Sequence, residues 1–241
     1  DEVIMPAYNF TSAATAVAKF GATPVFVDIE IETKGIDVNQ ARQAITKKTK
    51  AISWVNYAGV PPDIEGLQRL AKEFNILLIE DNAHGLGGVH ELGRRLGSLG
   101  DFSALSFHGT KNVQCGEGGA FLTSDKTYTD RAYIIREKGT NRRAFLEGTI
   151  DKYTWVDHGS SFLAPDYVAA FLAAQLESFD YIHRQREHAW NRYFVELNDW
   201  AGQIDAKLPT IPLNTAHPSH LFWLKLSNRS QRASFLSFLN S

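Results

Sequence analysis

Apolar and polar positions follow one another along the first third of the chain in a pattern that predicts strands separated by helices. Short apolar runs that end at proline, acidic or turn residues predict strands at residues 3–5, 24–27, 51–55 and 76–79. Apolar side chains at helical spacing predict helices over residues 11–19, 38–45 and 64–74. Strands that alternate with helices in this way are typical of parallel βαβ units, with helices over the sheet faces. We therefore expect an α/β fold with a mostly parallel central sheet.

Polar residues before the predicted helices indicate where each helix begins. Their side chains can accept hydrogen bonds from the free N–H groups of a first helical turn. The predicted capping residues are, in chain order, Thr11 or Ser12, Asp37, Asp63, and Ser124 or Asp125.

The pattern changes after Leu86, where glycines between residues 85 and 100 exclude a long helix. Two apolar strands, predicted at residues 102–107 and 120–123, then flank a polar loop that contains Lys111. Further on, the sequence predicts a helix over 128–138, a long loop rich in aromatic residues over 139–163, helices over 165–176 and 180–200, a strand over 221–226 and a helix over 231–239.

These elements suggest three parts. We expect a large domain over residues 1–178, an interdomain helix and linker over 179–208, and the start of a smaller, truncated domain over 209–241. The chain has no initiator methionine, opens inside a predicted strand and ends inside a helical pattern. We therefore expect it to be a fragment of a longer protein.

Composition excludes several classes of function. The net charge of -2 over 241 residues provides no basic surface for nucleic acid or for an anionic membrane. The single cysteine, Cys115, excludes an internal disulfide and suits a reducing compartment. No apolar run approaches the roughly 20 residues that a membrane-spanning helix needs. We expect a cytoplasmic protein with small-molecule substrates.

The candidate catalytic and binding residues follow predicted strands. Asp81 and His84 follow one strand, and Ser106 and Lys111 stand at the end of another. Ligands of open α/β sheets bind beyond the carboxyl ends of the strands, so these side chains are candidates for one site. A pyridoxal phosphate enzyme needs such a set: a lysine for the Schiff base, a carboxylate at the pyridine nitrogen, and hydroxyl and N–H groups around the phosphate.

Each of these residues also has an ordinary structural interpretation. A loop lysine such as Lys111 is usually solvated, Asp81 can cap a helix, and His84 can be a hydrogen-bonded histidine without a ligand. Ser106 can simply pair with a neighbouring strand. No G-x-G-x-x-G segment opens a helix, so a dinucleotide site is poorly supported. The spacing of His183 and His188 does not suit a metal site on one helical face, and we expect no metal.

Taken together, four segments resemble the DegT/StrS family of pyridoxal phosphate-dependent sugar nucleotide aminotransferases. These segments are Asp1–Pro6, Glu80–His84, Ser106–Asn112 and Gly116–Gly119. The resemblance covers essentially the whole chain, and it implies the large domain of aspartate aminotransferase fold type I, a homodimer with shared active sites, and synthesis of cell-surface polysaccharide.

The resemblance implies a role for each candidate residue. Lys111 would form the Schiff base and move the proton, and Asp81 would pair with the pyridine nitrogen. His84 stands where many members have glutamine, near the phenolic oxygen of the cofactor, and Ser106 would hold the phosphate. Many members have an asparagine near residues 160–161 that reaches the partner's phosphate; here both residues are serine, and that contact is not assigned.

Three further segments, Arg136–Arg142, Asp151–Trp155 and Gly159–Ser161, are similar to members that aminate 4-keto-6-deoxy sugars linked to dTDP, with glutamate as donor. A 3-aminotransferase, or an enzyme for GDP- or UDP-linked sugars, is the alternative within the family. Sugar dehydratases of this fold have histidine in place of the lysine, so Lys111 argues against them. A non-catalytic regulator that keeps the fold, and a nucleotide-binding α/β protein without pyridoxal phosphate, are the alternatives from other classes.

Overall fold

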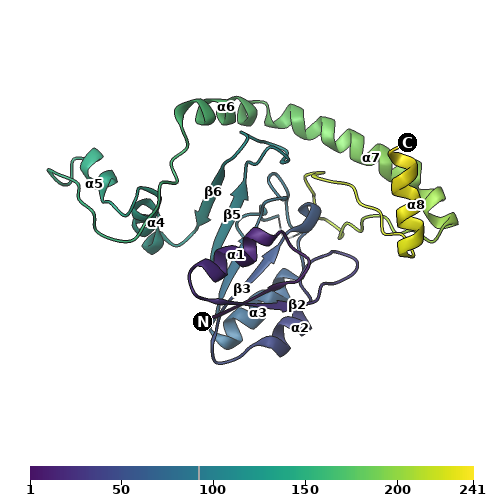
Figure 1. Cartoon of the computed structure of the whole chain (residues 1–241), viewed down its shortest axis with the longest axis horizontal. Coiled ribbons are helices and arrows are strands. Elements are labelled where there is room, and N and C mark those ends of the chain that lie inside the picture. Colours follow the sequence, from purple (N-terminus) through teal and green to yellow (C-terminus); the bar gives the residue numbers. More distant parts are fainter. Residues whose placement is uncertain (92) are drawn as a thin grey trace.

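A six-stranded sheet with the order β2-β1-β3-β4-β5-β6 forms the centre of the protein in the computed structural model, which describes residues 1–91 and 93–241 (Figure 1). All neighbouring strands are parallel except β5 and β6, which are antiparallel. The expected α/β fold with a mostly parallel sheet is confirmed. The strands are β1 Glu2–Pro6, β2 Thr23–Val27, β3 Thr49–Val55, β4 Leu77–Asp81, β5 Phe102–Ser106 and β6 Gly119–Thr123.

The helices lie close to the predicted ranges. In the sheet half of the chain they are α1 Thr11–Lys19, α2 Val38–Ala44 and α3 Ile64–Phe74, with a short 3₁₀ turn, η1, at Tyr57–Gly59. The second half contains the 3₁₀ turn η2 Lys126–Tyr128 and the helices α4 Thr129–Arg136, α5 Arg142–Leu146, α6 Asp166–Glu177, α7 Phe179–Gln203 and α8 Arg229–Leu239.

Of the four predicted helix caps, two are confirmed, one is wrong and one caps a neighbouring turn instead of its helix. Asp37 accepts hydrogen bonds from the N–H groups of Asn39 and Gln40, at 2.8 and 3.1 Å, and Asp63 accepts one from Gly66 at 2.8 Å. The start of α1 has no side-chain cap, because Thr11 is already helical and Phe10 occupies the capping position. Of the two candidates at residues 124–125, Asp125 is the cap, but it caps η2 rather than α4.

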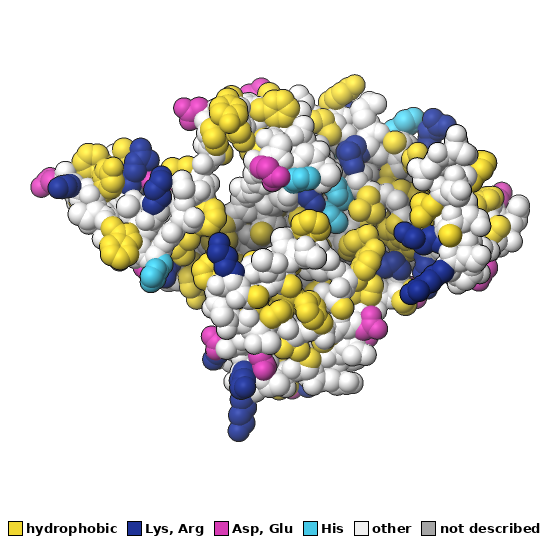
Figure 2. Space-filling model, viewed as in Figure 1, with side chains coloured by type: hydrophobic (Ala, Val, Ile, Leu, Met, Phe, Trp, Pro, Cys, Tyr) yellow, Lys and Arg dark blue, Asp and Glu magenta, His cyan; other side chains and the backbone are white. Residues whose placement is uncertain are grey.

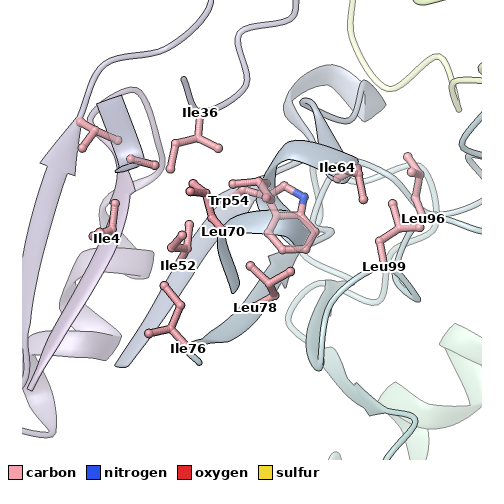
Figure 3. Packing of buried hydrophobic residues seen from close by; sticks show 13 residues of the cluster. Ile4, Ile36, Ile52, Trp54, Ile64, Leu70, Ile76, Leu78, Leu96 and Leu99 are labelled. Atoms are coloured by element: carbon pink, nitrogen blue, oxygen red, sulfur yellow. The ribbon is translucent and has the colours of Figure 1, made fainter. Parts of the chain in front are cut away.

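The main hydrophobic core lies between the sheet and helices α2 and α3. Successive strand residues point to opposite faces, so Ile4 and Ile52 face this core with Trp54, which is fully buried at its centre (Figure 3). Val3 and Met5 face the other side, where residues of α1 pack against them. Each fully buried side chain of this kind contributes roughly 1.5–3 kcal/mol, so the core holds the strand ends in place.

The second half of the chain extends away from the sheet. Figure 1 shows α4 and α5 as an arm on one side, and α6 and α7 running across the carboxyl side of the sheet toward α8. Trp200 of α7 packs against Phe235 of α8, with ring centroids 5.6 Å apart. The long loop expected over residues 139–163 contains the short helix α5. Among the described residues, no helix is long and apolar enough to cross a membrane.

The strand predicted at residues 221–226 is wrong. Within this range only Lys225 forms a bridge, an isolated antiparallel pair with Lys207. Alternating apolar and polar residues suit a strand that is buried on one face, but a strand also needs a neighbouring backbone to complete its hydrogen bonds.

Candidate active site

The carboxyl ends of β3, β4 and β5 meet along one edge of the sheet. Val55 pairs with Asp81, and Asp81 pairs with Ala104, so the residues that follow these strands lie side by side. Beyond β5, the Gly109 N–H donates to the Gly116 carbonyl at 2.8 Å, which closes the loop between β5 and β6. Lys111 lies in this loop, where its N–H donates to the carbonyl of His108 at 2.9 Å. The structure therefore places Lys111 at the carboxyl edge of the sheet.

Asp81 and Lys111 influence each other electrostatically across this edge. Burial raises the pKa of the Asp81 carboxyl, and both a hydrogen bond from the Ala83 N–H (3.1 Å) and the charge of Lys111 lower it in part. Burial lowers the pKa of the Lys111 amine, and the charge of Asp81 raises it in part. Among the described residues, no hydrogen bond involves the Lys111 amine or Oδ2 of Asp81. Both groups are thus left able to bind a ligand.

His84 lies next to this pair as a neutral imidazole. Burial lowers its pKa to about 4, and the charge of Lys111 adds to the effect. Its Nδ1 accepts a hydrogen bond of 3.3 Å from the N–H of Ala58, in the turn after β3. A neutral imidazole that accepts at Nδ1 carries its proton on Nε2. His84 therefore offers one N–H donor from Nε2.

Ser106, the last residue of β5, lies at the same edge. Its hydroxyl accepts a hydrogen bond of 3.3 Å from the N–H of His108, which leaves the hydroxyl proton available. Within the described part of the chain, no hydrogen bond joins Ser106 to Asp81, His84 or Lys111. Asp81 and His84 both lie close enough to Lys111 for its charge to lower their pKa values. Ser106 lies at the same edge, because Asp81 of β4 pairs with Ala104 of β5, two residues before it.

A row of rings crosses the strand ends, and only part of it was predicted. Tyr8 and Tyr57 share a hydrogen bond of 2.9 Å between their hydroxyl groups, and burial raises the pKa of Tyr57. Tyr57 contacts His84 edge-on, with ring centroids 5.6 Å apart. His220, from near the other end of the chain, stacks on His84 with centroids 4.3 Å apart. Sequence reasoning missed Tyr57 and His220, because neither lies in a motif and their contacts are distant in sequence.

A buried polar network joins the carboxyl ends of β3 and β4. Asn56 donates to Glu80 Oε1 at 2.7 Å and to Asn82 Oδ1 at 2.8 Å. Glu80 also accepts from the N–H groups of Gly97 and Leu99, at 2.6 and 2.8 Å. The glycine-rich segment is thus tied to the residue before Asp81. Buried polar groups that are satisfied in this way make a local structure rigid.

Two further features have no residue in common with this site. Glu65, His90 and Glu91 have ligand atoms within 4.8 Å of one another and could hold a metal ion. A cavity of about 460 Å³ is lined by Lys34, Trp223 and Lys225, among others. Asp81, His84, Ser106 and Lys111 belong neither to this carboxylate and histidine cluster nor to the lining of this cavity.

Comparisons with known proteins identify the family of the chain. The model of the DegT/DnrJ/EryC1/StrS aminotransferase family matches residues 1–241. An uncharacterised protein of Methanocaldococcus jannaschii is 33% identical over 230 residues, which are 94% of this chain and 58% of that protein. GDP-perosamine synthase of Escherichia coli O157:H7 is 38% identical over 191 residues, which are 78% of this chain and 50% of that enzyme.

A solved structure shows the same fold. The crystal structure of DesV from S. venezuelae, in complex with a ketimine intermediate, has a TM-score of 0.85 and 30% identity; the match covers 98% of this chain and 61% of DesV. This chain thus spans 50–61% of the length of these relatives. The chain belongs to the DegT/DnrJ/EryC1/StrS aminotransferase family.

Proposed function

We propose that this chain forms the cofactor-holding part of a pyridoxal phosphate-dependent sugar nucleotide aminotransferase. The observation that carries the proposal is that Asp81 and Lys111, both at the carboxyl edge of the sheet, lie close enough for each charge to shift the pKa of the other, while each is partly buried and open to a ligand. A lysine and an acid are the two side chains that this cofactor requires. Membership of the family supports the same conclusion.

The chemistry of the donor set fits the cofactor. Burial of the Asp81 carboxylate is unfavourable as long as its charge is not balanced, so a protonated ring nitrogen is a suitable partner for Oδ2. His84 offers its Nε2–H to the phenolic oxygen, and the Ser106 hydroxyl can donate to the phosphate. When bound, pyridoxal phosphate supplies an electron-accepting ring that stabilises negative charge on the substrate carbon.

Lys111 would hold the cofactor through a Schiff base and, once its amine is free, would move the proton. Burial lowers the pKa of its amine, so a larger fraction is neutral and able to accept a proton from the substrate carbon. The Asp81 carboxylate would keep a proton on the ring nitrogen. The loop between β5 and β6 positions the amine. Its backbone is held by the hydrogen bonds from Gly109 to Gly116 and from Lys111 to His108.

For the substrates, we propose glutamate as amino donor and dTDP-4-dehydro-6-deoxyglucose as acceptor. This is the reaction of a dTDP-4-amino-4,6-dideoxygalactose transaminase, which supplies cell-surface polysaccharides such as enterobacterial common antigen and lipopolysaccharide. The segments at residues 136–142, 151–155 and 159–161 support this choice. A GDP-linked sugar is the second candidate, because a relative with 38% identity is named GDP-perosamine synthase.

We also propose a cytoplasmic homodimer with shared active sites. Large apolar side chains remain exposed on the arm and on the helix that follows it: Trp155 is 73% exposed, Phe162 64% and Tyr167 76%. Figure 2 shows hydrophobic side chains gathered on the arm formed by α4 and α5. Aromatic surfaces of this kind are enriched at protein interfaces. The proposed division into parts at residues 1–178, 179–208 and 209–241 places this surface on the large domain.

Borohydride reduction tests the central claim. The full-length protein is incubated with pyridoxal phosphate, reduced and digested, and the adduct is located by mass spectrometry. We expect the adduct on Lys111 and its loss in Lys111→Ala, while Lys126→Ala, a lysine of η2, retains it. An unlabelled Lys111 would refute the proposal and favour a non-catalytic protein that keeps the fold.

Two further assays refine the substrates and the extent of the site. A panel of 4-keto and 3-keto sugars linked to dTDP, GDP and UDP should show the highest kcat/KM with the dTDP-linked 4-keto sugar. A preference for the GDP-linked sugar would select the second candidate. Residues 1–241 alone should bind the cofactor weakly and turn over slowly; a stable, active holoenzyme made from them would contradict this expectation.

A further inference from the structure

Residues 217–220 are held against the candidate site by contacts from several sides. Asn112, the neighbour of Lys111, donates to the carbonyl of Pro218 at 2.7 Å. Arg186 of α7 donates to the carbonyls of Ser219, at 3.3 Å, and of His220. Gly59 packs so closely on Pro218 that an added Cβ would come within 2.3 Å of the proline ring. The segment is thus fixed to the loop that contains Lys111 and to the turn after β3.

These contacts determine where the proton of His220 lies. The Asn112 amide nitrogen faces the Pro218 carbonyl, so its oxygen faces Nδ1 of His220, at 2.8 Å. An amide oxygen only accepts, and Nδ1 must therefore be the donor. Burial lowers the pKa of His220 to about 3, and a protonated His220 would also be repelled by a protonated His84 and by the charges of Lys111 and Arg186. His220 is thus neutral, with an unprotonated Nε2.

His84 has the opposite tautomer. Its Nδ1 accepts from the Ala58 N–H, and its Nε2 carries the proton. The two rings are stacked, with centroids 4.3 Å apart and planes inclined by 28°. Two neutral rings can stack at this distance without charge repulsion. The hydrogen bond to Ala58 fixes only one edge of the His84 ring, and the stack with His220 restricts rotation about that bond.

We propose that His220 is a positioning residue that fixes the plane of the His84 ring, so that the Nε2–H of His84 points at the phenolic oxygen of the cofactor. The inference rests on the proposed function. His220 performs this role because Asn112 and Arg186 hold its ring and backbone in place. A residue of the C-terminal segment thus contributes to the geometry at Lys111 without contacting the reacting atoms.

The test is a double-mutant cycle on the full-length holoenzyme. The readout is the pH midpoint of the change in visible absorbance of the cofactor bound to Lys111. A donor to the phenolic oxygen stabilises its deprotonated form, so loss of the donor raises the midpoint. We expect His84→Ala to raise it by about 0.5–1 pH unit, and His220→Ala by part of that shift. In the His84→Ala background, His220→Ala should add nothing.

Two other variants make the cycle specific. His220→Phe keeps a ring for stacking but loses the hydrogen bond to Asn112, so its midpoint should lie between those of the parent and His220→Ala. It also serves as the test variant if His220→Ala does not fold. His188→Ala, a change of an exposed histidine on α7, should leave the midpoint unchanged.

The outcomes separate this inference from the proposed function. An unshifted midpoint in His220→Ala, or the same shift with and without His84, would overturn the positioning role while the parent still labels at Lys111. If the parent shows neither a cofactor band nor an adduct on Lys111, the proposed function and this inference both fail.

Discussion

Asn56 donates a hydrogen bond of 2.7 Å to Glu80, and both side chains are completely buried between the ends of β3 and β4. Glu80 immediately precedes Asp81, so this bond fixes the backbone from which the candidate carboxylate extends. The same carboxyl group accepts from Gly97 and Leu99, which ties the glycine-rich segment to the sheet. The candidate site therefore rests on a rigid polar base.

Replacing Glu80 should destabilise the fold. In Glu80→Gln, one accepting oxygen becomes an NH₂ group, which cannot accept from the N–H of Gly97 or of Leu99. We expect a loss of about 2–4 kcal/mol in the free energy of unfolding, since a buried donor is left unpaired. Urea unfolding monitored by circular dichroism measures this loss. Glu73→Gln, which removes the charge of an exposed partner of Arg42, is the control and should have a much smaller effect.

Asp81→Asn should reduce catalysis more than it reduces folding. An amide cannot keep a proton on the ring nitrogen, so the cofactor accepts electrons less well. We expect kcat to fall by about a hundredfold or more, with a nearly unchanged urea midpoint. Half-reactions with glutamate, followed by cofactor absorbance, measure the effect. Asp199→Asn, an exposed change on α7, should retain full activity, and a comparable loss in this control would contradict a specific role for Asp81.

The stacked histidines should make stability depend on pH. Burial lowers the pKa of His84 to about 4 and that of His220 to about 3, from 6.5, and the charge of Lys111 adds to both shifts. Below pH 6.5 the unfolded chain therefore binds more protons than the folded chain, and stability falls as the pH drops toward 4. We expect the urea midpoint of the cofactor-free protein to decrease over this range.

A His84→Gln, His220→Gln double variant checks the source of this dependence. The urea midpoint of this variant should fall less steeply with decreasing pH, because both imidazoles with lowered pKa values are gone. Equal slopes in the parent and the double variant would show that other groups cause the dependence.

The exposed aromatic residues of the arm should control association. A carboxylate at position 155 or 162 would be buried unpaired in the proposed interface, at a high cost in free energy. We expect Trp155→Asp and Phe162→Asp to be monomers in size-exclusion chromatography with light scattering, at concentrations where the parent is a dimer. Leu213→Asp changes a residue that is 85% exposed outside the arm and should leave the dimer intact. Dimers in both arm variants would place the interface elsewhere.

Several features follow from the sequence by itself. The periods of apolar residues predicted β1 to β4 and α1 to α3 within a few residues, because each element buries one face and that face recurs at a fixed spacing. The position of Asp81 and Lys111 after strands indicated that both lie at the carboxyl edge. Their roles as cofactor ligands stay predictions, supported by the family to which the chain belongs.

Other features were decided only by tertiary structure. The segment at residues 221–226 alternates like a strand, but it has only one bridged residue, because strand formation depends on a partner that local pattern does not reveal. The stacking of His220 on His84 likewise depends on Asn112 and Arg186, which lie far from each other in the sequence. The spacing of apolar residues indicates which side of a helix or strand is buried. Which residue lies across a contact depends on how the whole chain packs.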